Sequence, residues 1–578
     1  MNQDLLKISL ERAGSWLSPL FDEETRKQVK YLMDHDEKEL IESFYTNLEF
    51  GTGGLRGIMG VGINRMNIYT VALATQGFAN YIIEQRPTPE LKVAIAHDCR
   101  NNSVLFAQTV ANVFSANGFK VYLFNSLRPT PELSYAVRYF GCSGGVVITA
   151  SHNPKEYNGF KAYWSDGGQL TAPHDKNVVK KVTELTLEQV KFDACKEKIE
   201  ILDEKFDEIF ISEVLKQTLS PDSVKKFNDI KIVYSALHGT GAKLVPAALK
   251  KMGFTNLHTV AQQDIPDGNF PTIHSPNPEE KAALDMALNL AEEVQADLVM
   301  ATDPDADRVG IAIRNSDGKL ELMNGNQTAS LLMYYVLRRW KENGLYNGNE
   351  YVIKTIVSSE LLSDIAKSYN VEVFNVLTGF KFIADVILRN EGKKKYICGG
   401  EESYGFLVGD YVRDKDAINA CVMIAECAAW AKSQNKSIYD ILMDIYAEYG
   451  LYKESLISIT KKGKEGIEEI GRMMAEYRQS PPTVINGYKV VSLFDYQLSV
   501  KKDIQTGAAT PIDLPKSNVL QFLTEDGSLI SVRPSGTEPK IKFYFGVKTP
   551  MTNKSEFAAA NAKLDEKINN IIDSLKLR

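Results

Sequence analysis

The chain has 578 residues, more than one hydrophobic core usually supports, so we expect about four domains. Apolar residues make up 44% of the chain and charged residues 24%, as in ordinary soluble globular proteins. The formal net charge of −7 argues against a nucleic acid as the main partner, because binding to a phosphate backbone requires a clustered basic surface.

Cysteine usage and the apolar segments indicate a cytoplasmic protein. The 6 cysteines are scattered without a CxxC pair, which disfavours a zinc site or a disulfide framework. The N-terminal segment carries Asp4 and Glu11 and has no long apolar run, unlike a signal peptide. The most apolar helical stretch, residues 420–431, is interrupted by Glu426 and is too short to cross a bilayer. We therefore expect no membrane partner.

Short β-type runs alternate with helical segments, which predicts α/β layering. The predicted strands come in pairs along three successive parts of the chain, and each strand ends in a polar, glycine-containing or charged loop. Because ligands collect beyond the carboxyl ends of strands in α/β sheets, these loops should build the site. The strands are expected at 92–96, 145–148, 230–234, 297–301, 351–357 and 395–398, and helices near 175–218 and 280–294.

The region from about residue 458 has a different pattern. It contains the alternating strand SLISVRP, the strand KIKFYF and a final amphipathic helix over about 554–575. This pattern predicts a separate α+β domain.

The first glycine-rich loop is GTGGLRG at 51–57. It either cradles a phosphate group through Arg56 or serves as a flexible connector. A glycine-rich loop is weak evidence by itself, so both interpretations stay open.

The segment TASHNP follows the strand at 145–148 and places Ser151 just beyond the end of that strand. No Asp–His relay and no GxSxG motif accompany this serine, which disfavours a hydrolase nucleophile. Ser151 is instead a candidate phosphoryl carrier, because a phosphate adds about −1.5 to −2 charge and acceptor oxygens that can complete a metal shell. His152 and Lys161 would then lie near the transferring group. For His152 a structural hydrogen-bonding role is as open as a catalytic one.

The segment TDPDADR at 302–308 is the clearest indication of a metal site in the sequence. Its aspartates alternate, so in an extended loop their carboxylates converge, and two carboxylates about 4 Å apart repel by roughly 4 kcal/mol at an effective dielectric near 20. Convergence therefore indicates a bound cation, with an acidic solvated turn as the alternative. All-oxygen ligands indicate Mg²⁺ or Ca²⁺, and an EF-hand is excluded because Arg308 and Arg314 replace its glycine and glutamate. The expected ligands are Asp303, Asp305 and Asp307.

Two further loops have ligand-binding character. GEESYG at 400–405 offers Glu401, Glu402 and Ser403 at a strand end, and carboxylates suit sugar hydroxyls, although acidic turns are common. RPSGTEPK at 533–540 joins two strands and aims backbone N–H groups, hydroxyls and a guanidinium at one anion; the alternative is a simple hairpin turn.

Five motifs in this order, GTGGLRG, TASHNP, DPDADR, GEESYG and RPSGTEPK, resemble the α-D-phosphohexomutase superfamily from about Phe50 to Phe545. The stretch PDGNFPTIHSPNPEE at 266–280 is similar to the phosphoglucomutase-2/phosphopentomutase branch. The resemblance implies three similar α/β domains with mixed sheets and a smaller C-terminal α+β domain around a central cleft. We expect these domains at 1–205 with the phosphoserine loop, 206–315 with the metal loop, 316–455 with the sugar loop and 456–578 with the phosphate loop.

The resemblance also implies residue roles. Ser151 would be phosphorylated and would bind Mg²⁺ together with Asp303, Asp305 and Asp307, while Lys161 would take part in proton transfer. Where some members have a catalytic histidine after the sugar loop, this chain has Tyr404 and Gly405; closer members use a lysine in an RxKD-like stretch, matched by Lys415. The substrate-binding set would comprise Arg56, Arg308, Thr378, Gly379, Glu401, Ser403, Arg413, Arg533, Ser535, Gly536 and Thr537.

The resemblance implies a phosphoglucomutase that interconverts α-D-glucose 1-phosphate and glucose 6-phosphate, with Mg²⁺ as cofactor and glucose 1,6-bisphosphate as intermediate and activator. Phosphopentomutase or phosphomannomutase activity is the alternative on the same scaffold. Two rival hypotheses are a sugar phosphatase with an aspartate nucleophile and a sugar-phosphate-binding protein without turnover. We expect sugar phosphates as the partners and a monomer or homodimer.

Overall fold

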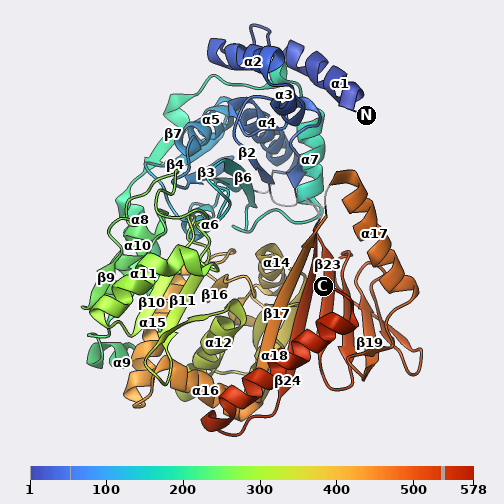
Figure 1. Ribbon diagram of the computed structural model, residues 1–578. Coiled ribbons are helices and arrows are strands. Elements are labelled where there is room, and N and C mark those ends of the chain that lie inside the picture. The colour runs from blue at the N-terminus through green and yellow to red at the C-terminus, as the bar shows by residue number, and fades with distance from the viewer. Residues whose placement is uncertain (1, 52–53, 87, 462, 536–539) are drawn as a thin grey trace. The chain divides into compact units, whose positions relative to one another are not determined.

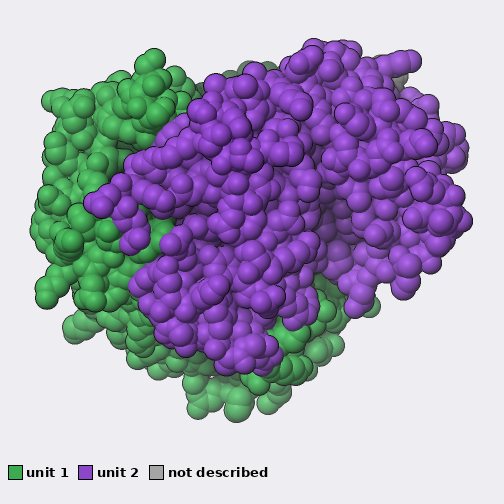
Figure 2. All heavy atoms as spheres, turned by 90° about the horizontal axis from the view of Figure 1, so that it is seen from below, with its two compact units in different colours: residues 1–324, 380–396, 403–433 green, residues 325–379, 397–402, 434–578 purple. Residues whose placement is uncertain are grey.

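The computed structural model describes residues 2–51, 54–86, 88–461, 463–535 and 540–578. The chain divides into two compact units, coloured separately in Figure 2. Unit 1 comprises residues 1–324, 380–396 and 403–433, and unit 2 comprises residues 325–379, 397–402 and 434–578.

The first sheet of unit 1 has the strand order β1-β2-β6-β5-β3-β4-β7. β3 pairs in parallel with β4 and β5, and β4 with β7, whereas β6 is antiparallel to both β2 and β5, so the sheet is mixed. The strands are β1 Phe50–Gly51, β2 Gly54–Ile58, β3 Lys92–His97, β4 Lys120–Phe124, β5 Gly144–Ile148, β6 Tyr157–Trp164 and β7 Ile199–Leu202.

Helices cover both faces of this sheet (Figure 1). β5 is buried along its whole length; Val146 and Ile148 join the cluster of α4 and α5, whereas Val147 joins that of α6 and α8. A strand buried on both faces is apolar without alternation, which is the pattern seen in its sequence. The helices are α4 Ile68–Gln85, α5 Ser103–Ala116, α6 Thr130–Tyr139, α7 His174–Thr183 and α8 Glu204–Leu215.

Three N-terminal helices, α1 Asn2–Ser15, α2 Glu23–His35 and α3 Glu37–Phe44, form their own small core. Trp16, Phe21 and Phe44 pack there against Tyr69 of α4. The helices expected near 175–218 are α7 and α8, and the chain between them contains two short 3₁₀ turns and β7. Edge pairing of β7 with β4 outweighs the local helix propensity of this segment.

The second sheet of unit 1 has the order β12-β11-β10-β8-β9. β8 is parallel to β9 and β10, whereas β10–β11 and β11–β12 are antiparallel. The strands are β8 Ile232–Ser235, β9 Leu257–Thr259, β10 Leu298–Thr302, β11 Val309–Arg314 and β12 Leu320–Met323; α11 Lys281–Val294 packs on one face, and α15 Ala417–Ser433 contacts β10, β11 and α10 Gly241–Met252.

The apolar helix α15 is buried in unit 1. Its Glu426 accepts hydrogen bonds from the backbone N–H groups of Leu219 (2.9 Å) and Ser220 (2.7 Å) at the start of α9 Pro221–Lys226, which explains a carboxylate in an apolar helix. Among the described residues, no helix has the length and apolarity needed to cross a membrane.

Unit 2 begins with a parallel strand pair and its helices. β13 Glu350–Thr355 pairs with β14 Glu372–Val376, and α12 Gly325–Glu342, α13 Leu361–Ser368 and α16 Ile438–Tyr449 pack on one another beside them. β15 Lys395–Gly400 starts in unit 1 and ends in unit 2, while α14 Phe380–Asn390 and β16 Phe406–Val408 belong to unit 1.

The C-terminal part of unit 2 is an antiparallel sheet in the order β17-β24-β23-β22-β19-β20-β21, with β18 beside β19. Figure 1 shows α18 lying along β17 and β24. The expected α/β layers with mixed sheets and the distinct C-terminal α+β part are thereby confirmed. The elements are β17 Leu451–Thr460, α17 Gly463–Gln479, β18 Val484–Ile485, β19 Tyr488–Asp495, β20 Val500–Asp503, β21 Ala509–Pro511, β22 Leu520–Thr524, β23 Leu529–Pro534, β24 Lys540–Thr549 and α18 Phe557–Ser574.

Candidate functional site

Three buried carboxylates converge in unit 1 where β10 ends. One oxygen each from Asp303, Asp305 and Asp307 lies within 4.8 Å of the others. The expectation of an extended loop is wrong, because the Ala306 N–H donates to the Asp303 carbonyl (2.9 Å) and Ala306 has φ 49°. Asp303 Oδ1 also accepts from the N–H groups of Asp307 (3.1 Å) and Arg308 (3.0 Å). Convergence therefore results from a tight turn.

Two lysines contact this carboxylate cluster. Lys161 Nζ, from β6, lies 2.6 Å from Asp305 Oδ2 and 3.1 Å from Asp307 Oδ2, and Lys415 Nζ lies 3.0 Å from Asp307 Oδ2. At an effective dielectric near 20, each such contact contributes about 5 kcal/mol of attraction, enough to offset the repulsion of one carboxylate pair. Burial lowers the pKa of Lys161, but Asp305 and Asp307 outweigh burial and raise it, so its ammonium stays charged.

The donor set of the cluster fits a hard divalent cation. Asp305 Oδ1 and Asp307 Oδ1 are buried and have no hydrogen-bond partner within the described part of the chain. Burial, together with Asp305 and Asp307, raises the pKa of Asp303 well above its usual range. Burial also raises the pKa of Asp307, but Lys161 and Lys415 outweigh it and hold that pKa low. Oxygen ligands of this kind suit Mg²⁺ or Ca²⁺.

Ser151 faces the same cluster. It follows β5 by three positions, is 3% exposed, and donates from Oγ to Asp303 Oδ2 at 2.7 Å. Its backbone has φ 51°, and its N–H donates to Thr149 Oγ1 (2.8 Å). The serine hydroxyl and the aspartate loop, 152 residues apart in sequence, are therefore neighbours.

His152 Nδ1 lies 3.1 Å from Ser151 Oγ. Burial lowers the pKa of His152 well below its ordinary value, and the cations Arg308 and Arg56 lower it further, so the imidazole is neutral. A neutral ring can orient the serine oxygen through either tautomer.

The arginines expected to bind substrate in unit 1 differ in their surroundings. Arg56 Nη1 donates to Asn153 Oδ1 (3.1 Å) beside the serine turn, and Arg308 Nη1 pairs with Glu279 (3.0 Å). Arg413 is 1% exposed; its guanidinium pairs with the Glu391 carboxylate (3.0 Å) and donates to the carbonyls of residues 410 and 412. These contacts hold Arg413 in the framework.

The segment around Lys415 is fixed by hydrogen bonds within unit 1. Asp414 accepts from the Tyr163 hydroxyl (2.7 Å) and lies 3.2 Å from Lys415 Nζ. Tyr404 has φ 64°, and its carbonyl accepts from Val309 at the start of β11 (3.1 Å). Ser403, of the expected sugar loop, is partly exposed directly before Tyr404.

The other expected substrate residues lie in unit 2. The Gly379 N–H donates to Glu401 Oε1 (2.9 Å), so Glu401 and the loop carrying Thr378 and Gly379 are adjacent. Arg533 is in β23 opposite Lys542 of β24, and the Ser535 N–H donates to the Lys540 carbonyl (2.7 Å). Gly536 and Thr537 lie outside the described residues.

Sequence reasoning missed two residues beside the serine and the aspartates. Thr130, at the start of α6, donates from Oγ1 to Asp305 Oδ2 (2.9 Å) and from its N–H to the Asp305 carbonyl (2.9 Å). Arg100 donates to backbone carbonyls of the turn that carries Ser151. The motif HDCR after the strand at 92–96 is a signal for Arg100, whereas no pattern in the sequence marks Thr130.

Comparisons with known proteins agree with this arrangement. The family profiles described as Phosphoglucomutase/phosphomannomutase alpha/beta/alpha domains I, II and III match residues 47–189, 208–318 and 324–449, and the C-terminal domain profile matches 483–564. A phosphoglucomutase of Staphylococcus aureus strain MRSA252 is 39% identical over 510 residues, which cover 88% of this chain and 91% of that protein. A phosphoglucomutase of Staphylococcus haemolyticus strain JCSC1435 is 37% identical over 511 residues, with the same coverage.

Solved structures share the fold at lower identity. The phosphoglucomutase pp63/parafusin of Paramecium has a TM-score of 0.67 at 18% identity, over 92% of this chain and 96% of that chain. A phosphoglucomutase/phosphomannomutase family protein of Burkholderia thailandensis has a TM-score of 0.64 at 17% identity, over 91% of this chain and 97% of that chain. With profile matches along most of its length and relatives near 38% identity, the chain belongs to the α-D-phosphohexomutase superfamily, as an intramolecular phosphotransferase of the phosphoglucomutase family.

Proposed function

We propose that the chain interconverts α-D-glucose 1-phosphate and glucose 6-phosphate through a phosphoserine at Ser151 and a glucose 1,6-bisphosphate intermediate. The observation that supports this best is the 2.7 Å contact of Ser151 Oγ with Asp303 in a buried carboxylate cluster flanked by Lys161 and Lys415. A serine hydroxyl in such a place has around it the charges that a transferring phosphoryl group needs.

Asp303, Asp305, Asp307 and the phosphorylated Ser151 are the proposed ligands of Mg²⁺. Bound there, Mg²⁺ would neutralise charge on the transferring phosphoryl group. Oxygen donors, and the two carboxylate oxygens that have no hydrogen-bond partner in the described chain, support this assignment.

In the proposed transfer, the bond between Ser151 Oγ and phosphorus breaks while a sugar hydroxyl oxygen bonds to phosphorus. A lysine ammonium donates a proton to Ser151 Oγ as that bond breaks, and the amine so formed takes up the proton of the sugar hydroxyl. The reverse transfer moves the opposite phosphate of the bisphosphate back to Ser151 Oγ. Lys161 and Lys415 are the proposed acid–base pair because both ammonium groups contact the carboxylates next to Ser151. His152 is proposed to orient Ser151 Oγ.

The remaining expected residues are proposed to hold the sugar phosphate. Thr378, Gly379, Glu401 and Ser403 would bind sugar hydroxyls, and the cationic and hydroxyl groups would bind phosphate. We also retain the four domains at 1–205, 206–315, 316–455 and 456–578 as a proposal. The proposed phosphate and substrate contacts are Arg56, Arg308, Arg413, Arg533, Ser535, Gly536 and Thr537.

The test is Ser151→Ala in a mutase assay, together with the intact mass of the wild-type chain. We expect the wild type to gain one phosphoryl group from glucose 1,6-bisphosphate and to exchange it with substrate, and the variant to lose both this mass and turnover. A phosphatase would release inorganic phosphate steadily with or without Ser151. A binding protein would never change mass. Near-normal mutase turnover by Ser151→Ala would end the proposal.

A second candidate is phosphopentomutase activity, favoured by the stretch at 266–280. Catalytic efficiency for glucose 1-phosphate, ribose 1-phosphate and mannose 1-phosphate, measured with the bisphosphate supplied, discriminates among the sugars. A preference for glucose 1-phosphate supports the first proposal.

A further inference from the structure

Arg100 lies in the turn that follows β3, and its side chain contacts the turn that carries Ser151. Its side chain and that of Asp98 are both 0% exposed, and Arg100 Nε lies 3.2 Å from Asp98 Oδ2. Asp98 Oδ1 accepts from the Arg100 N–H (2.9 Å) and from the Ser103 hydroxyl (2.8 Å). The guanidinium therefore lies in ion-pair contact with a buried carboxylate.

The guanidinium binds four backbone carbonyls of one turn. Nη2 donates to the carbonyls of Ser151 (2.6 Å) and Asn153, and Nη1 donates to those of Pro154 (2.8 Å) and Tyr157 (3.0 Å). Because the acceptors are spread over residues 151–157, their carbonyls must point toward one centre. A planar guanidinium matches this arrangement, whereas an ammonium group does not.

This arrangement opposes the local strain at Ser151. A left-handed backbone at a residue other than glycine is strained and persists only where surrounding contacts hold it. The Ser151 peptide is held on both sides, since its N–H donates to Thr149 Oγ1 and its carbonyl accepts from Arg100. Hydrogen bonds to a charged group are stronger than those between neutral groups, so the bonds from Arg100 help to offset the cost of the strained conformation. The strained backbone directs Ser151 Oγ to Asp303.

The stretch at 266–280 covers the side chain of Arg100. The ring of Phe270 lies over the guanidinium, with 5.2 Å between the guanidinium carbon and the ring centroid. A Cβ atom at Gly268 would overlap the backbone nitrogen of Asn101, so only glycine lets the segment approach this closely. The stretch at 266–280, to which the proposed mechanism assigns no role, thus covers the buried guanidinium.

We propose that Arg100, ion-paired with Asp98 and covered by Phe270, is a positioning residue for phosphoryl transfer: it fixes the backbone of residues 151–157 so that Ser151 Oγ faces the carboxylate cluster. This inference rests on the proposed phosphoserine function. It adds a residue that acts through Ser151 without touching the sugar phosphate.

The test is Arg100→Lys, which keeps the charge but loses the planar donor fork. Misplacement of a reacting group by about 1 Å costs on the order of 100-fold, so we expect kcat to fall by about that factor while KM for the sugar phosphate stays unchanged. The single-turnover rate of Ser151 phosphorylation by glucose 1,6-bisphosphate should fall equally.

Arg314→Lys is the matched control. Arg314 also donates to backbone carbonyls, those of Ala296 (2.8 Å), Gly318 (2.6 Å) and Ala291 (3.2 Å), but at the opposite end of β11 from the aspartate turn. This variant should lower the local stability of β11, measured by hydrogen exchange, and leave kcat unchanged. Phe270→Leu is a second test variant. It is expected to lower kcat less than Arg100→Lys does and to leave KM unchanged. If Arg100→Lys does not fold, Phe270→Leu tests the positioning role of Arg100.

The outcomes separate the two hypotheses. Absence of mutase turnover and Ser151 phosphorylation in the wild type overturns the proposed function. Wild-type turnover that Arg100→Lys or, where that variant does not fold, Phe270→Leu retains in full overturns the role of Arg100. A loss of kcat in Arg100→Lys matched by an equal loss in Arg314→Lys also overturns it, because the effect is then general destabilisation.

Discussion

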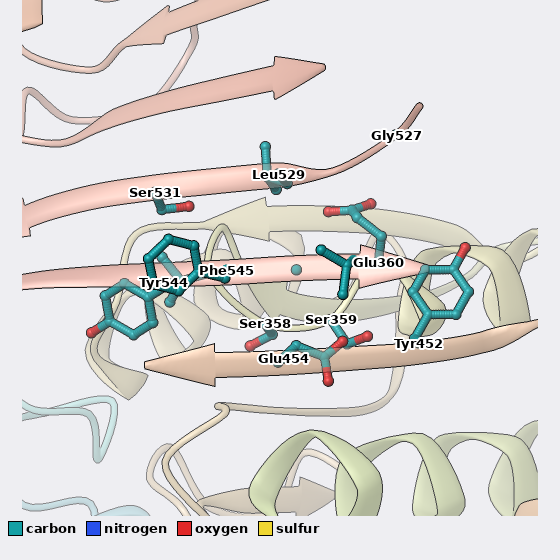
Figure 3. Close-up of a pocket in the computed structure, with 13 residues that line it drawn as sticks. Ser358, Ser359, Glu360, Tyr452, Glu454, Gly527, Leu529, Ser531, Tyr544 and Phe545 are labelled. Carbon is teal, nitrogen blue, oxygen red and sulfur yellow. The ribbon is translucent and has the colours of Figure 1, made fainter. Parts of the chain in front are cut away.

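Replacing Glu454 by glutamine should abolish a pH dependence of stability in unit 2. Glu454 projects from β17 into a cavity of about 30 Å³ beside Ser358, Ser359 and Glu360 (Figure 3). Burial raises the pKa of Glu454 to about 7, only partly offset by the Ser359 hydroxyl and Lys354. The folded protein therefore keeps a proton on Glu454 at a pH where the unfolded chain has released it.

The magnitude follows from the two pKa values. A rise from 4.5 to about 7 corresponds to about 3 kcal/mol at roughly 1.4 kcal/mol per pH unit. This contribution is fully present below pH 4.5 and is lost as the pH rises through about 7, because the folded state binds more protons than the unfolded state in that window. In Glu454→Gln the side chain cannot titrate, so its share of the slope should vanish.

The measurement is hydrogen exchange by mass spectrometry on peptides from β17 and β24, between pH 5 and pH 8 and corrected for intrinsic exchange rates. Hydrogen exchange gives the free energy of local opening. We use it because one global unfolding transition is not expected for a chain of several domains. Glu448→Gln, at an exposed position of α16, is the control and should keep the wild-type slope. Identical pH dependence in the wild type and in Glu454→Gln would refute the reasoning, because the proton would then not be retained in the cavity.

Two further predictions concern the carboxylate cluster. Thr130→Val removes the hydroxyl that donates to Asp305 and should weaken Mg²⁺ activation by about 10- to 100-fold, as is typical for partners of metal ligands; titration of activity with Mg²⁺ measures it, and Thr130→Ser should remain near the wild type. Lys161→Met and Lys415→Met should each lower kcat by about 10²- to 10⁴-fold, the usual contribution of an acid–base group. Both amines contact Asp307. An unchanged kcat in either lysine variant would show that this lysine is not a member of the proposed acid–base pair.

Several parts of the fold and the site were predictable because they are local in sequence. The aspartates at 303–307 follow a strand within a few residues, so their proximity to one another depends on a short turn. The strand at 145–148 lacks polar alternation, which is the pattern of a strand covered on both faces. The carboxyl ends of such strands carry Ser151 and the aspartates, as expected for an α/β sheet.

Local reasoning was less accurate where backbone conformation depends on contacts. The aspartate turn is tight and not extended, because Asp303 accepts from backbone N–H groups that an extended chain would present elsewhere. The segment between α7 and α8 contains β7, because pairing with β4 outweighs helix propensity there.

The amino-acid sequence alone determined which residue types the candidate site contains: a hydroxyl, alternating carboxylates and glycine-containing loops in a fixed order, with the hydroxyl and the carboxylates directly after strands. Only the tertiary structure decided which side chains contact one another. Lys161 and Thr130 reach Asp305 across 144 and 175 residues, and Arg100 reaches Ser151 across 51. Such contacts depend on the register and direction of packed elements, which no short sequence window specifies.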